Sequence, residues 1–198
     1  WGSIVGGVGN DPVSYAIPAG EELPIVLDAA HSVVAHGKVA LAREEGKKIP
    51  LGWGVDEKGN PTTDPNALKA MLPAGGYKGS GQAVVMEVLS GILPGSRSCF
   101  EAQQARERGD KWRIGHFFWA LDIEGFMPLG RFKQRVDEYI RAAKALPKAP
   151  GVEKIYMPGE IEFELKAERL ENGIPLARST VAALQELGEE LGVEIELG

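Results

Sequence analysis

Short apolar runs alternate with loops rich in glycine and proline along the whole sequence, and this alternation limits the folds open to the chain. The 198 residues include 26 Gly and 13 Pro. The longest apolar runs, such as 83–86 and 117–121, fall far short of the roughly 20 residues that a bilayer-spanning helix needs. We therefore expect no membrane span, and an α/β fold in which strands and helices follow one another through one body.

The composition excludes several classes of protein. Hydrophobic residues make up 43% and charged residues 25%, which is typical of a globular chain. The net charge of −6 argues against a nucleic-acid-binding surface. Cys99, the single cysteine, suits a reducing compartment such as the cytoplasm and has no companions with metal-ligand spacing. Because the sequence starts at Trp1 without an initiator Met, we expect that it begins partway through a longer protein.

Local patterns predict the elements and their order. Apolar runs indicate strands, 3.6-residue periodicity indicates helices, and Ser, Gly and Pro mark their ends. The run ending in Asp28 predicts a buried central strand, followed at once by a helix with Ser32 as its cap. The predicted strands are 13–17, 24–28, 114–123 and 154–157. The predicted helices are a short one at 66–71, a buried one at 84–93, an amphipathic one at 131–146, a charged one ending at Glu171, and 180–191. Residues 50–65 and 72–81 are predicted loops, and 96–112 a surface excursion.

The second glycine-rich loop, 72–81, is a candidate anion site. It leads into a helix, where free N–H groups and the helix dipole favour phosphate, and Lys78 adds a cation. The Walker pattern is absent, because Tyr77 precedes the lysine and Gly79 follows it. The alternative is a tight turn with a solvated lysine, and composition alone favours this alternative.

Asp28 and the histidines after it form a second candidate site. Asp28 ends a strand before a helix, where ligands bind in open α/β sheets, so its carboxylate could accept from a ribose hydroxyl. It could equally be a helix-capping acid. The spacing of His31 and His36 does not suit a metal pair on one helical face, so we expect no metal site. His36 and Lys38 could still offer a proton donor and a cation to a carboxylate substrate.

Ordered sequence blocks resemble the type 2 malate/L-lactate dehydrogenase family. The matching blocks cover nearly the whole chain in the family's order. They are GNDP with SYAIP (9–18), similar to its GTNP block; IVLDAAHS (25–32), similar to VLDMATS; VVAHGK (33–38); PLGWGVDEKGNPTTDP (50–65); MLPAGGYKG (71–79), similar to LLPFGGYKG; GHFFWALD (115–122), similar to GHFFLAID; and the late PGE turn (158–160).

This resemblance implies an NAD- or NADP-dependent oxidoreductase that transfers a hydride between the nicotinamide and a small 2-hydroxy or 2-keto acid. The implied fold is a non-Rossmann, mixed-sheet cofactor-binding region over 1–146, with a strand, a turn and helices over 147–198 packing back on it. A homodimer is implied, without nucleic-acid or membrane partners. The implied cofactor contacts are Asp28, Ala29, Ala30, Tyr77, Lys78, Pro158, Gly159 and Glu160, and the implied substrate contacts are Asn10, His36 and Gly37. Lys38 receives no role.

The sequence also departs from the family pattern. His31 and Asn10 stand where the family has Thr, Ala29 where it has Met, and Asp11 where it has Asn. The resemblance places the proton-transferring His, with its Ser and Arg, in an amino-terminal region outside this chain, so we expect the chain alone to be inactive. Two alternatives stay open: a nucleotide- or ligand-binding module that has lost catalysis, and a structural or interaction remnant.

Overall fold

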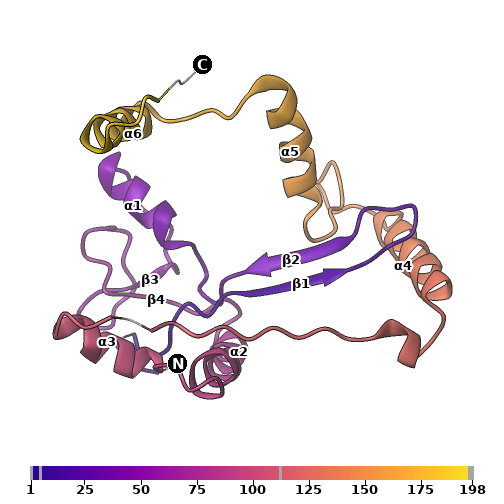
Figure 1. Ribbon diagram of the computed structural model, residues 1–198, viewed down its shortest axis with the longest axis horizontal. Coiled ribbons are helices and arrows are strands. Elements are labelled where there is room, and N and C mark those ends of the chain that lie inside the picture. The colour runs from indigo at the N-terminus through magenta and orange to yellow at the C-terminus, as the bar shows by residue number, and fades with distance from the viewer. Residues whose placement is uncertain (1, 5, 112, 196–198) are drawn as a thin grey trace.

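The computed structural model describes residues 2–4, 6–111 and 113–195. Within these residues, two antiparallel two-stranded sheets and six α-helices make up the regular structure (Figure 1). In chain order the elements are β1 (Val13–Ile17), β2 (Ile25–Ala29), α1 (His36–Glu44), β3 (Gly54–Val55), β4 (Ala70–Met71), α2 (Tyr77–Glu87), the π-helical turn η1 (Val88–Ile92), α3 (Cys99–Glu107), the 3-10 turn η2 (Ile123–Gly125), α4 (Leu129–Lys144), α5 (Glu160–Asn172) and α6 (Arg178–Leu191).

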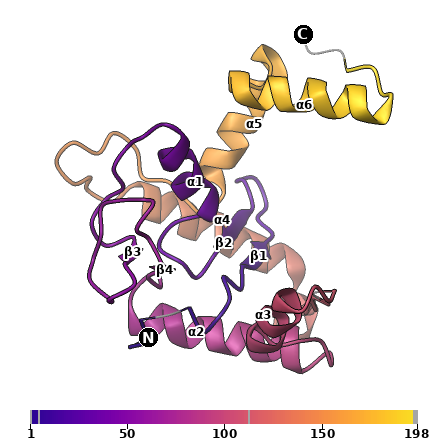
Figure 2. The same cartoon turned by 90° about the vertical axis from the view of Figure 1, so that its left-hand side faces the viewer.

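The ribbon formed by β1 and β2 crosses the middle of the molecule, and α2 lies below it in both ribbon views (Figures 1 and 2). The strands pair antiparallel, with Val13 opposite Ala29 and Ser14 opposite Asp28. Strand alternation therefore places Ala29 and Asp28 on opposite faces of the ribbon. The predicted strand 13–17 is confirmed. The prediction that the second strand is central and buried is wrong, because the outer edge of β2 meets the Pro158 carbonyl, through Val26 N–H at 2.9 Å, instead of another strand.

Helix α4 fixes the loop that joins β1 to β2. Asp137 on this helix is 5% exposed, and its carboxylate accepts the backbone N–H groups of Gly20, Glu21 and Glu22 at 2.9, 2.9 and 3.2 Å. Arg141, one turn further along, binds the carboxylates of Glu21 and Glu22, both at 2.7 Å. The predicted amphipathic helix is thus confirmed within two residues at each end, and it anchors the ribbon through a buried acid.

The PGE turn fastens the start of α5 to β2. Gly159 has φ +89°, and a Cβ there would lie 2.8 Å from the Val26 carbonyl oxygen, so this position requires glycine. Beyond the turn, α5 and α6 rise away from the earlier elements (Figure 2). The predicted stop of α5 at Gly173 is confirmed, since this glycine is its C-cap.

Three predicted elements do not form. Residues 66–71 are not a helix, because the preceding loop folds back so that Ala70–Met71 pairs with Gly54–Val55. Residues 114–122 are extended but have no partner strand in the described chain, and 154–157 are irregular. A strand needs a neighbour to supply its hydrogen bonds, and an apolar run cannot guarantee that neighbour.

Other boundaries also differ from the predictions. Ser32 does not cap a helix, since α1 starts only after Ala35, with no side-chain cap. Ser32 Oγ instead lies 2.6 Å from Asn10 Oδ1 and 2.7 Å from the Val34 carbonyl oxygen, and its single hydrogen is donated to one of these two acceptors. The stretch 96–112 contains α3, which starts with a capping box between Ser98 and Glu101. The helix predicted at 84–93 begins at Tyr77 and continues as the π-helical turn η1. The prediction that it is buried is wrong, because its large apolar side chains, such as Val85 and Leu93, are exposed.

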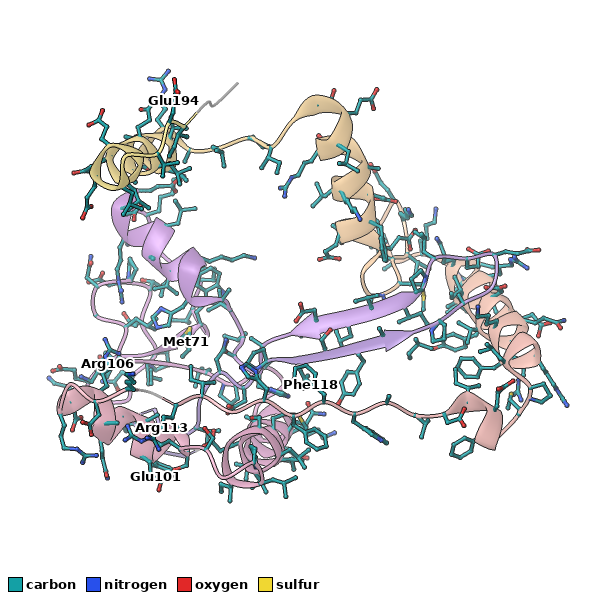
Figure 3. The ribbon with its side chains drawn as sticks, viewed as in Figure 1. Met71, Glu101, Arg106, Arg113, Phe118 and Glu194 are labelled. Atoms are coloured by element: carbon teal, nitrogen blue, oxygen red, sulfur yellow. The ribbon has the colours of Figure 1, made fainter. Side chains whose placement is uncertain are left out.

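The molecule exposes far more surface than its mass predicts. Its accessible area is 14,903 Å², whereas a compact monomer of 21.2 kDa exposes about 9,000 Å². Large apolar side chains contribute to this surface. Phe118, labelled on the extended segment in Figure 3, is 89% exposed, and Trp119 is 75% exposed. No helix in the described part of the chain has the length and apolar character to cross a membrane.

Candidate functional site

A cavity of about 260 Å³ lies between the ribbon and the first turns of α2. The ribbon contributes Tyr15, Leu27 and Ala29 from one face, and α2 contributes Gly79 and Gln82. Ala30 and His31 close the side where the chain leaves β2. The alternation of β1 and β2 therefore decides which ribbon residues face this cavity.

The N-terminus of α2 opens beside this cavity. Gly76, at φ +66°, precedes the helix, and no side chain of the described residues caps it. Gly79 is buried, and a Cβ there would collide with the carbonyl oxygen of Ala74, so the turn 73–76 packs directly on the helix backbone. The uncapped N–H groups and the helix dipole favour an anion here. Exposed Lys78 in the same turn adds a positive charge.

His31 is the buried polar side chain of the cavity wall, with 8% of its surface exposed. Its backbone N–H donates to the Asn10 carbonyl at 3.1 Å, and its carbonyl accepts from Ala74 N–H at 2.8 Å. Its ring nitrogen Nδ1 lies 2.5 Å from the Asp11 carbonyl oxygen. These contacts hold the imidazole between the segment before β1 and the turn before α2. The sequence assigns His31 no ligand role, because nothing in its local pattern predicts these contacts.

Asp11, whose carbonyl oxygen contacts the His31 ring, lies close to a second acid, Glu87. Burial, followed by the negative charge of Glu87 and a hydrogen bond with it, raises the pKa of Asp11 to about 6. Asp11 Oδ2 is buried and has no hydrogen-bond partner in the described chain. Glu87 Oε1 also accepts the backbone N–H of Cys99 at 2.5 Å. Burial and then Glu87 raise the pKa of the Cys99 thiol, so the arrangement disfavours a reactive thiolate.

Some of the predicted ligand residues come together around the cavity. Ala29 and Ala30 line it, and Tyr77 and Lys78 form the first two positions of α2, directly before the lining residue Gly79. Asn10 lies alongside through its carbonyl contact with His31 N–H. The end of β2 and the lysine-bearing turn therefore lie near the same cavity, and their contacts with a cofactor stay predictions.

The other predicted residues lie elsewhere. Asp28 is exposed on the ribbon face opposite the cavity. The turn 158–160 sits at the outer edge of β2, and the Glu160 carboxylate already binds Lys144 and Lys154, at 2.6 and 2.7 Å. His36 and Gly37 are the exposed first residues of α1. The roles of all these residues toward a cofactor or substrate stay predictions.

Comparison with known proteins identifies the family. A family model described as malate/L-lactate dehydrogenase matches residues 1–185. The chain belongs to this dehydrogenase family. The family resemblance of the sequence blocks is thereby confirmed.

Individual dehydrogenases of the family match nearly the whole chain. A malate dehydrogenase of Pyrococcus horikoshii is 36% identical over 94% of this chain and 54% of its own length. A (2R)-3-sulfolactate dehydrogenase (NADP(+)) of Chromohalobacter salexigens is 36% identical over 87% of this chain and 50% of its own. The crystal structure of malate dehydrogenase from Entamoeba histolytica superposes with a TM-score of 0.86 at 27% identity, covering 94% of this chain and 56% of that one. The chain therefore spans about half the length of these relatives.

Proposed function

We propose that this chain is the cofactor-side part of a dehydrogenase that transfers a hydride between NAD or NADP and a small 2-hydroxy or 2-keto acid of the malate or lactate type. The observation that carries the proposal is the junction of an uncapped helix N-terminus with a cavity lined by Ala29 and Ala30. The bound cofactor would supply the hydride. The similarity to an NADP-dependent sulfolactate dehydrogenase supports the choice of cofactor class.

The residues at the junction fit a dinucleotide. N–H groups at the start of α2, together with Lys78, match the negative charge of a diphosphate. The adjoining cavity walls are mostly apolar and would exclude water from a ring placed there, which protects hydride chemistry. Helix α2 follows β4, a strand of an antiparallel pair, instead of a parallel strand of a βαβ unit. This connection supports a non-Rossmann mode of binding.

The unusual exposed area supports an assembly larger than one chain. An ordinary interface buries about 800 Å² on each partner, and the accessible area exceeds that of a compact monomer by several times this value. We infer that the working protein is a homodimer. We also propose that it works in a reducing compartment such as the cytoplasm, and that further polypeptide supplies the proton-transferring histidine. Light scattering should give at least twice the mass of one chain, and a monomer at micromolar concentration would contradict the dimer.

The proposed function is tested by binding before turnover. NADH and NADPH are titrated against the chain by fluorescence, and 2-keto acids are then added while absorbance at the nicotinamide band is followed. We expect saturable binding of at least one dinucleotide and no turnover by the chain alone. If neither dinucleotide binds, the proposal fails and the structural-remnant alternative gains support.

Replacing Lys78 by alanine tests the anion site. A charge-assisted contact to phosphate predicts about a tenfold increase in the dissociation constant of the dinucleotide. The matched control is Lys48→Ala, which removes the same charge from another exposed position and should leave the constant unchanged. Equal constants for wild type and Lys78→Ala would return this lysine to the role of a solvated loop residue.

A further inference from the structure

The ring of His31 presents a free nitrogen at the cavity wall. Its Nδ1 faces the Asp11 carbonyl oxygen at 2.5 Å, and a carbonyl can only accept, so Nδ1 carries hydrogen. In the neutral ring Nε2 is then an acceptor. Among the described residues, the Asp11 carbonyl oxygen is the hydrogen-bond partner found for the His31 ring. The side chain as a whole is more than nine-tenths buried, but Nε2 is not among the fully enclosed polar atoms of the described chain that lack a partner. It is therefore accessible at the cavity wall, and a ligand that covers it must supply a donor.

The cavity limits what that donor belongs to. About 260 Å³ is below the roughly 300–1,000 Å³ of pockets that enclose drug-sized ligands, so the space suits one ring with a small substituent. Among the described residues, those that line the cavity include no Lys, Arg, Asp or Glu. A carboxylate substrate would lack a counter-charge there, whereas an uncharged heteroaromatic amide would lose little on burial if its N–H groups were bonded.

The neighbours of His31 indicate which end of a bound dinucleotide occupies the cavity. Asn10, which the sequence assigns to the substrate, accepts His31 N–H through its carbonyl and Ser32 Oγ through its side chain. The anion site at the start of α2 begins at Tyr77, two residues before Gly79 in the cavity wall. A ring in the cavity thus lies between a diphosphate site and a substrate site, which is where a hydride carrier must lie.

We propose that His31 is a recognition residue for the nicotinamide, whose carboxamide N–H₂ donates to His31 Nε2 inside the cavity. This inference rests on the function proposed above. The contact uses the Asp11 carbonyl to hold the imidazole in one tautomer, so that the ring favours a donor at the ligand's amide position. Replacing the amide of the ligand by a group without N–H leaves the acceptor unpaired.

The test compares by calorimetry the binding of three dinucleotides to wild type, to His31→Asn and to a control variant. They are the cofactor that wild type binds, its 3-acetylpyridine analogue, which has a methyl ketone in place of the carboxamide, and its hypoxanthine analogue, which lacks the amino group of adenine. Wild type should bind the acetylpyridine analogue about fivefold to tenfold more weakly than the cofactor. His31→Asn keeps an N–H near the position of Nδ1 but has no atom at Nε2, and it should bind the two equally.

The controls separate the possible failures. His116→Asn, on the exposed extended segment, should keep the wild-type preference. If wild type binds the cofactor and the acetylpyridine analogue equally, the proposed role of His31 is overturned, even if His31→Asn does not fold. A preference against the hypoxanthine analogue that depends on His31 also overturns this role. If wild type binds no dinucleotide, the proposed function itself has failed. If His31→Asn loses the preference for the cofactor over the acetylpyridine analogue while its melting temperature equals that of wild type, the contact between His31 and the carboxamide is supported. A purely structural role of His31 is then excluded.

Discussion

Asp137→Ala is expected to lower the melting temperature by about 5–10 °C, since it removes the acceptor of three backbone N–H groups in one step. Gly20, Glu21 and Glu22 turn their N–H groups inward to this one carboxylate, and a methyl group cannot accept them. The loop between β1 and β2 would then separate from α4. Thermal unfolding followed by circular dichroism measures the change.

Two further variants define the cause. Asp137→Asn keeps Oδ1, which accepts from Gly20 and Glu22, but places an amide N–H₂ where Glu21 needs an acceptor, so it should show an intermediate loss. Glu138→Gln alters the exposed neighbouring acid and should change the melting temperature by less than about 1 °C. An Asp137→Ala protein that melts with wild type would show that the loop is held by other contacts.

Protonation of the Asp137 carboxylate is expected to destabilise the fold at low pH. The N–H group of Glu21, with those of Gly20 and Glu22, lowers the pKa of Asp137 below its ordinary value of 3.8. Its stabilisation is therefore complete above the unfolded pKa and is lost as the pH falls through the folded one. Wild type should lose stability below about pH 4, and the Asp137→Ala protein should lose less over the same range.

The second large effect is expected at Glu160. This side chain is 8% exposed and binds Lys144 and Lys154 through Oε1, while Oε2 accepts Met157 N–H at 3.1 Å. Glu160→Gln should lower the free energy of unfolding by about 2–3 kcal/mol, because two lysines lose their shared anion at a mostly buried position. Chemical denaturation in urea at pH 7 measures the loss.

The matched control is an exposed acid that binds the same lysine. Glu164 also binds Lys154 but is 49% exposed, so Glu164→Gln should cost less than about 1 kcal/mol. Similar losses in the two variants would show that burial does not strengthen the Glu160 pair. Cofactor affinity measured on Glu160→Gln additionally tests the contact that the sequence predicts for this residue.

The pH dependence of Glu160 has a defined sign. Burial alone would raise its pKa, but hydrogen bonds from Lys144 and Lys154 outweigh burial and lower the pKa from 4.5 to about 2. The contribution of Glu160 is thus fully present above about pH 4.5 and disappears between there and pH 2 as acid is added. In Glu160→Gln this part of the acid transition should be missing, and an unchanged transition would contradict the lowered pKa.

Local patterns were sufficient for the elements whose signals lie within a few residues. The stripe of apolar residues in α4 and the stop at Gly173 each depend on neighbours in sequence, and both predictions agree with the structure. The ordered sequence blocks also identify the family without reference to the tertiary structure. The prediction of a strand at 114–123 is wrong for the opposite reason, because a strand depends on a partner strand that is often distant in sequence.

The sequence by itself determined the family, the ribbon strands, the amphipathic helix and the placement of Lys78 near the start of a helix. Only the tertiary structure decided that Ala29 faces the cavity while Asp28 faces away, that Asp137 and Glu160 are buried anchors, and that His31 is a wall of the cavity. The contacts responsible join residues that are separated by between 16 and 117 positions in the sequence. Burial, hydrogen bonding and pKa all depend on such distant neighbours, and a local pattern carries no information about which neighbours these are.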